Sequence, residues 1–385
     1  MFGDFEILKK CKTTNARVSR FTLNNNTLDL PIFMPVGTYG AIKGVPVEDL
    51  KEQMILSNTY HLRNLKKNVK NFMKWKGSML TDSGGFQIGS LPNVEVTEEG
   101  VLFDKKLFTP EESMDIQMGL GADIIMQLDE VVNPNDPIDK IEVACKRSIR
   151  WLDRCIKQVY GSEDEENPKR VKENLPQIKL EARNQILFPI VTGGLDDSLR
   201  QYSIDEIVKR NPKGLAIGGL SGGEAKSEFA RTVLYCTTHL PDSIPRYVMG
   251  VGYPEDIVIC SALGTDMSDC VYPTRTARFG RMFSDTGDIY ITNKLKGETK
   301  KRQDCDCFTC KNYSLAYLSM LKGTTNFCIL TTIHNMHYMR NLTRRIREAI
   351  LKDEYPEFIK NYMNTRYEKV PEWIVDVLKK VNVEV

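Results

Sequence analysis

Short apolar runs rich in strand-forming residues alternate with amphipathic stretches of helical length up to about residue 285. Such alternation is typical of βα units, in which helices join the strands. The predicted strands are the runs 30–36, 54–57, 79–81, 123–128, 186–191, 215–217, 247–249 and 267–271. Eight strands alternating with helices predict an α/β fold, a (β/α)8 TIM barrel, in which functional residues lie at the carboxyl ends of the strands.

The segments between these runs carry the signals of helix ends. Pro110-Glu111-Glu112 opens a helical stretch that continues through Gly119. Another stretch, over residues 202–210, is closed by Asn211-Pro212. A doubly wound open sheet is the weaker alternative, because no Gly-x-Gly-x-x-Gly sequence opens a helix after the first strand.

The composition is that of an ordinary globular protein. The chain has 385 residues, of which 41% are hydrophobic and 27% are charged, which excludes collagen-like, mucin-like and wholly disordered classes. No apolar run approaches the ~18 to 20 residues that cross a bilayer. The opening MFGDFEILKK mixes acidic and basic residues too early for a secretory signal. We therefore expect a soluble protein of the cytoplasm.

The net charge of +2 conceals an uneven distribution. Residues 275–352 hold 15 Lys and Arg against 6 Asp and Glu, a surplus of +9, so the rest of the chain carries −7. A basic segment of this length on a nearly neutral protein favours one surface that binds a polyanion, of which nucleic acid fits best. The alternative is a solvated helix surface near residues 340–352.

Three of the ten cysteines are crowded at Cys305, Cys307 and Cys310. This spacing cannot easily form disulfides within itself, but it places three thiolates around one tetrahedral ion. Only two histidines follow as a fourth ligand, His334 and His337, and a closed Cys3His set is typical of structural zinc. Free thiols or redox chemistry are the alternative. The seven scattered cysteines are expected to be mostly buried thiols in a reducing compartment.

These features predict three domains. Residues 1–285 form the catalytic barrel, in which the charged, proline-containing segment 161–173 is expected to be a surface insertion. Residues 286–350 hold the crowded cysteines and a basic helix, and are expected to form an appended zinc-binding subdomain. Residues 351–385 are expected to be a helical segment that packs on the barrel, with apolar positions at Ile374, Val375, Val377 and Leu378.

Glycines and carboxylates follow the predicted strands from the third to the eighth. These exits are Thr81-Asp82-Ser83-Gly84-Gly85-Phe86-Gln87, Asp129-Glu130, Thr192-Gly193-Gly194, Gly218-Gly219-Leu220-Ser221-Gly222-Gly223-Glu224, residues 250–256, and Asp266 and Asp269 with residues 273–278. Glycine lets the backbone approach a flat or anionic ligand closely. A single glycine pair is usually loop geometry, but four glycine-rich exits on one rim with at least three carboxylates indicate a ligand site.

This set of residues fits glycosyl transfer. An aspartate nucleophile can take the anomeric carbon while a second carboxyl group protonates the leaving group and then recovers a proton from the acceptor. The sequence holds no plausible Ser-His triad, no His-Glu-x-x-His motif and no P-loop lysine motif. Hydrolases and nucleotide triphosphatases of these types are therefore excluded.

Longer segments carry a family resemblance between about residues 18 and 340. They are PIFMPVGT, SNTYHL, LTDSGGFQ, VTEEGV, DIIMQLDE, SIRWLDRC, AIGGLSGGE, YVMGVGYPED, MSDCVYPTRTARFG, CDCFTC and His334-Asn335. In them the chain resembles the tRNA-guanine transglycosylases (queuine tRNA-ribosyltransferases), specifically the eukaryotic catalytic subunit. This family exchanges guanine at the anticodon wobble position for a 7-deazaguanine base without cutting the RNA. The resemblance therefore implies a pentosyltransferase that works by double displacement.

The resemblance also implies residue roles. Asp269 is similar to the nucleophile that forms a covalent ribosyl intermediate, and Asp82 to the general acid/base. Phe86 and Met249 resemble the plates that sandwich the base. Asp129 would accept from the guanine-type N1 and amino donors, while the backbone of Gly219 and Leu220 would meet another edge of the base. The remaining expected base contacts are Ser83, Gly84, Gly85, Thr192 and Gly222.

Contacts to tRNA and metal follow in the same way. The expected tRNA contacts are Gly250, Val251, Gly252, Tyr253, Pro254, Glu255, Asp256, Thr274, Arg275, Thr276, Ala277 and Arg278. Among these, Arg275 and Arg278 can bind phosphate or a splayed anticodon base through the guanidinium fork. The resemblance favours His334 over His337, so that Cys305, Cys307, Cys310 and His334 would hold one structural Zn²⁺.

Three positions bear on base choice. Gly222 and Val131 are expected to leave room for the cyclopentenyl arm of queuine, so that the base enters tRNAs with a G-U-N anticodon (those for tyrosine, histidine, aspartate and asparagine). The family has glutamine where Thr192 stands, and a short hydroxyl cannot span the same distance. We expect either a bridging water or base binding weakened by about 1–3 kcal/mol.

Two other functions stay open at this level. A non-catalytic tRNA-binding subunit of a heterodimer is disfavoured by the presence of both Asp82 and Asp269. A barrel enzyme for a small phosphorylated metabolite is disfavoured by the basic residues at 275–352. The resemblance implies a dimer, either of two identical chains or with a non-catalytic paralogous subunit.

Overall fold

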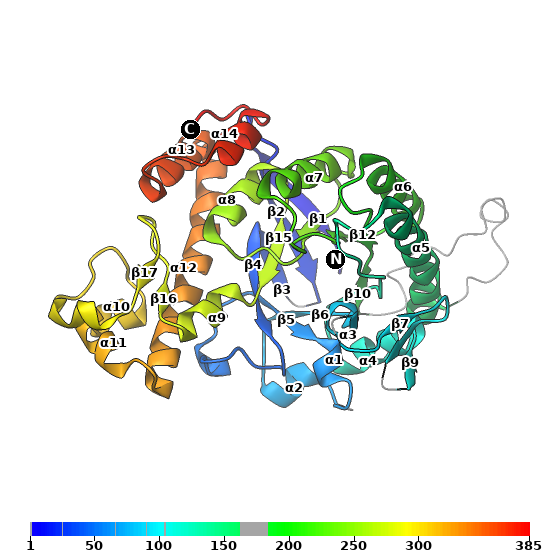
Figure 1. The fold of residues 1–385 in the computed structure, drawn as a ribbon, viewed down its shortest axis with the longest axis horizontal. Helices are drawn as coiled ribbons and strands as arrows, with labels where there is room; N and C mark the ends of the chain where they lie inside the picture. Colours follow the sequence, from blue (N-terminus) through cyan, green and yellow to red (C-terminus); the bar gives the residue numbers. More distant parts are fainter. Residues whose placement is uncertain (1, 25, 66, 90, 104, 162–183) are drawn as a thin grey trace.

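The computed structural model describes residues 2–24, 26–65, 67–89, 91–103, 105–161 and 184–385. Short parallel strands lie at its centre, and helices surround them (Figure 1). The central strands are β4 (Ile32–Gly37), β5 (Met54–Asn58), β6 (Ser78–Asp82), β10 (Ile124–Met126), β11 (Ile186–Phe188), β12 (Ile190–Val191), β13 (Leu215–Ile217), β14 (Arg246–Val248) and β15 (Met267–Cys270). Each of the eight predicted runs overlaps one of these strands, and the run 186–191 contains two.

The central sheet closes on itself. Its hydrogen-bonded order is β11-β10-β6-β5-β4-β15-β14-β13-β12, and only Pro189 separates β11 from β12 at its two ends. The side chain of Gln127 completes the junction, because its Oε1 accepts from the Ile190 amide at 2.8 Å. The predicted (β/α)8 barrel is therefore confirmed, and the open doubly wound sheet is wrong.

Helices cover the barrel as its crossovers. They are α1 (Thr59–Leu62), α2 (Val69–Met73), α3 (Gly85–Gly89), α4 (Pro110–Leu120), α5 (Ile138–Tyr160), α6 (Asp197–Lys209), α7 (Lys226–His239), α8 (Pro254–Ala262) and α9 (Tyr272–Arg278). α4 begins at the predicted Pro110, where the Thr109 hydroxyl caps it by accepting from the Glu112 amide at 3.1 Å. α6 begins earlier than predicted because Asp196 caps it through the Leu199 amide at 2.8 Å.

The sequence analysis missed two small antiparallel sheets. The first contains β1 (Phe5–Lys10), β2 (Arg17–Leu23) and β3 (Asn26–Leu30), and β3 leads directly into the amino end of β4. Its Phe21 and Leu28 are buried in one cluster with Leu80, Met126 and Tyr247 of the barrel interior, so this sheet closes the amino end of the barrel. The second contains β7 (Glu95–Val96), β8 (Val101–Phe103) and β9 (Lys106–Phe108).

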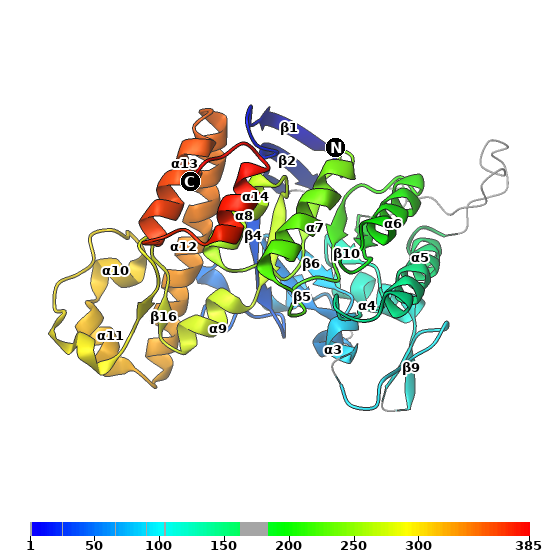
Figure 2. The same ribbon diagram turned by 45° about the horizontal axis from the view of Figure 1, so that its top comes forward.

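The C-terminal third is built on one long helix, α12 (Thr325–Leu351). On one side of α12 lies a lobe of residues 281–323, called the cysteine lobe below, and on the other side lies the barrel (Figures 1 and 2). The lobe contains β16 (Arg281–Met282), β17 (Ile289–Tyr290), the 3-10 turn η2 (Asn293–Gly297), α10 (Phe308–Asn312) and α11 (Leu315–Leu321). The predicted division of the chain at residues 285 and 350 stays a prediction.

The chain ends in two helices where one segment was predicted, α13 (Tyr355–Arg366) and α14 (Glu372–Lys379). Ile374, Val377 and Leu378 are buried in one cluster with Ile257 and Val258 of α8. Apart from Gly161, the predicted insertion 161–173 lies outside the described residues. None of the helices in the described ranges combines the length and the apolar character that a membrane crossing requires.

Candidate active site

The carboxyl ends of the strands bring the predicted acidic residues to one rim. Asp82 is the last residue of β6, Asp269 is the last but one residue of β15, and Asp129 follows β10. The negative charge of Asp269 contributes to raising the pKa of Asp82, and the charge of Asp82 contributes to raising that of Asp129. The three carboxyl groups therefore act on one another electrostatically across the same end of the barrel.

One oxygen of Asp269 is fixed by two donors. Its Oδ1 accepts from the Tyr247 hydroxyl at 2.5 Å and from the Gly250 amide at 2.9 Å. The described residues provide no hydrogen bond to Oδ2. Burial, followed by the charge of Asp269, holds the pKa of Tyr247 well above its ordinary value, so the phenol keeps its proton and remains a donor. This arrangement leaves Oδ2 as an oriented oxygen at the barrel rim.

Asp82 is suited to exchanging a proton near neutral pH. Burial, and then the negative charge of Asp269, raise its pKa to about 6, although hydrogen bonds from the Ser83 and Gly84 amides oppose the rise. The Asn58 amide group also donates to its Oδ2 at 3.1 Å. Asn58 is held in place because its own Oδ1 caps α1 by accepting from the His61 amide at 3.3 Å. A carboxyl group with such a pKa can act as an acid and then as a base.

Asp129 is a buried acceptor without a cationic partner. The residue is 5% exposed, and among the described residues no lysine or arginine forms an ion pair with it. Burial, then the charges of Asp82 and Glu130, raise its pKa to about 7. A buried carboxylate in this state gains most from a ligand that brings its own N–H donors.

The two side chains predicted to sandwich the base, Phe86 and Met249, are apolar, unlike the carboxylates. The Phe86 ring is 62% exposed at the start of α3, and Met249 is half-buried directly after β14. Before Phe86, Ser83, Gly84 and Gly85 are buried. Gly84 has a φ of +88°, and a Cβ there would lie 3.0 Å from the Tyr60 amide nitrogen, so this turn requires glycine. The sandwich of the base stays a prediction.

Thr192 is buried directly after β12, whereas Gly222 is exposed in the loop after β13. The Thr192 hydroxyl is buried and has no hydrogen-bond partner in the described part of the chain. A Cβ on Gly222 would lie 2.6 Å from Cδ of Pro134, and the Asn133 amide group donates to the Gly222 carbonyl at 3.0 Å. The missing side chain at 222 therefore makes room for Pro134. The hydrogen bond from Asn133 joins this exit to the loop after β10. The role of Gly222 in queuine choice stays a prediction.

The predicted tRNA contacts divide into buried and exposed residues. The buried ones are Val251, Gly252, Pro254, Asp256, Thr274 and Ala277. Asp256 is held by an ion pair with Lys226. Gly250, Tyr253 and Arg275 are exposed, while Arg278 is half-buried and donates to the Thr274 carbonyl at 2.8 Å. Glu255 and Thr276 are half-buried as well. Contact of this rim with RNA stays a prediction, and the buried members have little side-chain surface for it.

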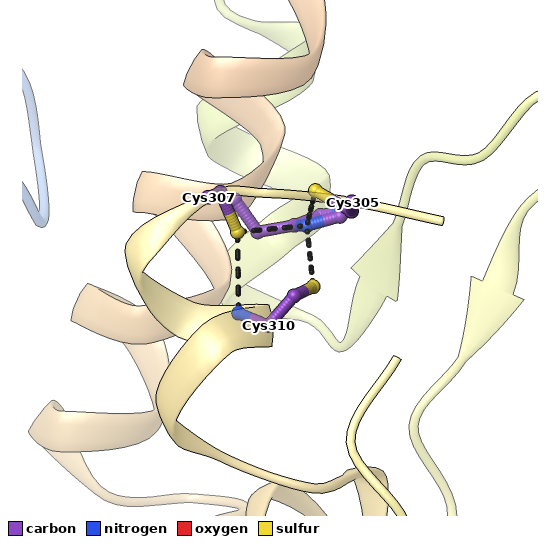
Figure 3. A group of neighbouring side chains, drawn as sticks. Cys305, Cys307 and Cys310 are labelled. Carbon is purple, nitrogen blue, oxygen red and sulfur yellow. Dashed lines mark hydrogen bonds between the residues drawn. The ribbon is translucent and has the colours of Figure 1, made fainter. Parts of the chain in front are cut away.

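The crowded cysteines and His334 form one group of ligand atoms. Cys305, Cys307 and Cys310 point toward one another beside α12 (Figure 3), and all four ligand atoms lie within 4.8 Å of one another. The distances from His334 Nδ1 to the three Sγ atoms are 3.6, 3.4 and 3.4 Å. Tetrahedral zinc with ordinary bond lengths separates sulfur from nitrogen by about 3.6 Å, so the four residues fit this ion.

A second contact orients the histidine. His334 Nε2 lies 2.8 Å from the Phe283 carbonyl, which places the ring proton on Nε2 and leaves Nδ1 free to bind a metal. The other predicted histidine is engaged elsewhere, because His337 lies 2.7 Å from Asp306 Oδ1 and 3.1 Å from a guanidinium nitrogen of Arg340. The structure therefore selects His334 of the two histidines.

Sequence reasoning missed three residues that build the rim. Asn58 and Tyr247 lie within SNTYHL and YVMGVGYPED, two of the segments that carry the family resemblance, but no role was predicted for either side chain. Arg200 of α6 is fully buried, and its guanidinium donates to the carbonyls of Val191, Gly194 and Gly218. No pattern around Arg200 in the sequence indicates that role.

Comparison with known proteins places these residues in a family context. A family model described as queuine tRNA-ribosyltransferase matches residues 11–368. The queuine tRNA-ribosyltransferase catalytic subunit of Schizosaccharomyces pombe is 42% identical over 99% of this chain and 97% of its own length. The protein of that name from Caenorhabditis elegans is 39% identical over 94% of this chain and 95% of its own length. The queuine tRNA-ribosyltransferase of Buchnera aphidicola is 40% identical over 94% of this chain and 99% of its own length.

Proposed function

Because the chain belongs to the queuine tRNA-ribosyltransferase family, we propose that it is a catalytic tRNA-guanine transglycosylase, a pentosyltransferase that replaces the wobble guanine of tRNA by queuine. The observation that carries this proposal is the pair Asp269 and Asp82 at one barrel rim. The first has an oriented oxygen, and the second has a pKa of about 6.

In the first step, Oδ2 of Asp269 attacks C1′ of the nucleotide. The bond between C1′ and N9 of guanine breaks, an ester forms between Asp269 and the ribose, and the base leaves with the electron pair. Asp82 donates its proton to the departing base, for which its raised pKa suits it. Tyr247 and the Gly250 amide hold Oδ1, so that Oδ2 is the atom that bonds to carbon.

The second step runs in the opposite direction with another base. The ionised Asp82 takes the proton from N9 of the incoming base, and N9 attacks C1′. The ester bond breaks, and Asp269 regains its carboxylate. The phosphodiester backbone takes no part in either step, so the RNA stays intact.

Asp129 supplies recognition of the base. Its buried carboxylate faces no cation among the residues described, and guanine-type bases offer N1–H and an exocyclic amino group on one edge. Two such donors would satisfy both carboxylate oxygens and favour its ionised form. Bases without these donors would leave Asp129 buried and unpaired, which excludes them.

Trapping of the covalent intermediate tests the proposal. The chain is incubated with tRNA without free base and then denatured, and we expect an RNA–protein adduct that Asp269→Asn abolishes. The exposed Asp205 of α6 serves as the matched control, since Asp205→Asn should retain the adduct. An adduct that survives Asp269→Asn would contradict the proposal. No adduct together with no guanine exchange would favour the alternative, a non-catalytic tRNA-binding subunit.

Base and tRNA choice need a separate measurement. We propose that queuine enters tRNAs with a G-U-N anticodon, those for tyrosine, histidine, aspartate and asparagine. Labelled queuine should appear in these tRNAs and not in a tRNA with another wobble base. If queuine never enters while the smaller bacterial precursor base does, the specificity is wrong although the enzyme class is right.

We also propose one structural Zn²⁺ per chain, held by Cys305, Cys307, Cys310 and His334. When bound, zinc cross-links the cysteine lobe to α12 and has no open position for catalysis, because four protein ligands complete a tetrahedron. A dimer, of two such chains or with a non-catalytic paralogous subunit, and location in the cytoplasm belong to the same proposal.

A further inference from the structure

A buried cation lies behind the exits of β12 and β13. Arg200 of α6 has no exposed surface, and it forms no ion pair with any carboxylate in the described ranges. Its Nε and one terminal nitrogen donate to the Gly194 carbonyl at 2.9 and 2.7 Å. Its other terminal nitrogen donates to the carbonyls of Val191 and Gly218, at 2.9 and 2.8 Å. One guanidinium thus ties three peptide groups of two neighbouring strand exits together.

A hydrogen bond that holds a peptide carbonyl also fixes the direction of the N–H in the same peptide group. In a trans peptide the C=O and N–H bonds point in opposite directions. Because Arg200 holds the Gly218 carbonyl, the amide of Gly219 points away from Arg200. Gly219 is partly exposed, and no described residue accepts a hydrogen bond from its amide. Its φ of +64° is one that only glycine adopts without strain.

The charge of Arg200 acts through the same peptide. A guanidinium that donates to a carbonyl polarises the peptide group and makes its N–H a stronger donor. The charge is buried, so water does not screen it. A donor of this kind stabilises an anion that develops beside it, as in an oxyanion hole.

We propose that Arg200 is a positioning residue that aims the Gly219 amide at the O6 edge of the base and strengthens it as a hydrogen-bond donor. This inference rests on the proposed function, in which Asp129 takes the N1 and amino donors of guanine. The neighbouring group on the ring is then the acceptor O6, which requires an N–H partner. Negative charge reaches O6 as the base leaves C1′, so the contact strengthens along the reaction.

The first test compares two buried arginines of the same helix region. Arg200→Lys keeps a charge but cannot reach three carbonyls, and we expect the KM for guanine in base exchange to rise about tenfold, with the KM for tRNA changed by less than twofold. Arg210 is equally buried but is paired with Asp153, so Arg210→Lys should change neither KM. A general loss of folded enzyme lowers the maximal rate and moves no KM. An unchanged KM for guanine in Arg200→Lys would overturn the proposal.

A second measurement isolates the O6 contact. 6-Thioguanine keeps the N1–H and amino donors of guanine but has sulfur, a weaker hydrogen-bond acceptor, in place of O6. As a competitive inhibitor, it should lose less than twofold in Ki on Arg200→Lys, whereas guanine loses about tenfold. Equal losses for the two bases would overturn the proposal, because they would mean that Arg200 supports the pocket without acting on O6.

A third measurement needs no variant and tests the contact of the Gly219 amide with the base even if Arg200→Lys does not fold. Saturating guanine should slow amide hydrogen exchange at Gly219 in the unaltered chain. The Gly218 amide, which already donates to the Val191 carbonyl at 3.0 Å, is the internal reference and should not change. No added protection at Gly219 would overturn the inference while leaving the covalent adduct, and with it the proposed function, intact.

Discussion

At the scale of single residues, the candidate site depends on hydrogen bonds that reach each carboxylate from a different strand. Tyr247 reaches Asp269 from the neighbouring strand β14, and Asn58 reaches Asp82 from the neighbouring strand β5. In both cases the donor is itself fixed, Tyr247 by burial in the barrel interior and Asn58 by capping α1. The two acids therefore have different environments although both are half-buried aspartates at strand ends.

Tyr247→Phe removes one of these donors without changing the ring. Loss of a hydrogen bond to a charged group costs about 1.5–3 kcal/mol, so we expect the rate of adduct formation to fall about ten- to a hundredfold. The KM for tRNA should stay the same, because Tyr247 is buried beneath the rim. Tyr235, whose hydroxyl donates to Gln201 on the outer helices, provides the control Tyr235→Phe. An unchanged rate in Tyr247→Phe would mean that Oδ1 needs no fixed partner.

The two half-reactions should depend on pH in opposite directions. Adduct formation at saturating tRNA requires protonated Asp82 and ionised Asp269. Burial raises the pKa of Asp269, which limits the rate at acidic pH, and above that range the rate should fall as pH rises through the Asp82 pKa of about 6. Adduct breakdown at saturating guanine requires ionised Asp82, so its rate should rise with pH. In the adduct Asp269 is a neutral ester and no longer raises the pKa of Asp82, so this rise should be centred below 6. Single-turnover rates between pH 5 and 8 measure both, and profiles of the same sign would contradict the assigned role.

Thr192 is the position where the chain departs from the family pattern. Its hydroxyl is buried without a partner, and glutamine there would carry an amide long enough to reach the base. We expect Thr192→Gln to raise kcat/KM for the base about tenfold, which corresponds to about 1.4 kcal/mol. A loss of activity in a variant that still unfolds at the original temperature would refute the idea that this site is short of one contact.

At the scale of elements, the sequence predicted those features that depend on a local pattern of residues. Each barrel strand is a short apolar run with buried residues on both faces, and such runs stand out because they are separated by helical stretches. The spacing of Cys305, Cys307 and Cys310 fixes a metal-type geometry within six residues. The early start of α6 was missed because Asp196 becomes a cap only through the conformation of the loop before it.

The features that the sequence did not predict depend on contacts between residues that lie far apart in the chain. The sheet β1–β3 is stabilised by packing of Phe21 and Leu28 on residues of the barrel interior, which no local window contains. The strands β7 to β9 have two or three residues each, too few for a periodic signal. The contacts of Tyr247 and Arg200 depend on which strands lie side by side, and the barrel closure sets that order.

α12 links the metal site to the barrel within one element. His334 faces the cysteines, while Met339, Leu342 and Ile346 are buried in the cluster formed with α8. Removal of zinc by a chelator should therefore loosen the cysteine lobe and leave the barrel folded, because few apolar residues form the core of the lobe. Limited proteolysis should then cut within residues 293–323, and His334→Ala should reproduce this result without chelator.

The matched control for that experiment is the exposed His239 of α7, and His239→Ala should leave the lobe resistant to protease. Metal analysis should give one zinc per chain in the unaltered protein and less than one in His334→Ala. Resistance of the lobe after complete zinc removal would show that the ion is dispensable for its fold.

At the scale of the whole molecule, access and charge point to the same end of the barrel. The sheet β1–β3 covers the amino end, so a substrate reaches the interior from the rim that carries Asp82 and Asp269. The basic residues 275–352 begin directly after the strand that carries Asp269 and continue through the cysteine lobe into α12. The positive surplus therefore begins beside the candidate nucleophile, as expected for a surface that guides a polyanion to the site.

This arrangement predicts that tRNA affinity falls steeply with salt. Each phosphate contact releases bound counterions, so log K should decrease linearly with log salt concentration, with a slope of about −0.7 to −0.9 per contact. Arg275 is exposed on α9, the first helix after β15, and Arg275→Gln should weaken tRNA binding several-fold and reduce the slope by about one. Lys360 is exposed on α13, outside the basic region, so Lys360→Gln should change neither quantity. If both substitutions acted equally, or if affinity did not depend on salt, the surplus charge of residues 275–352 would be a solvated surface and the RNA would be held by the base pocket alone.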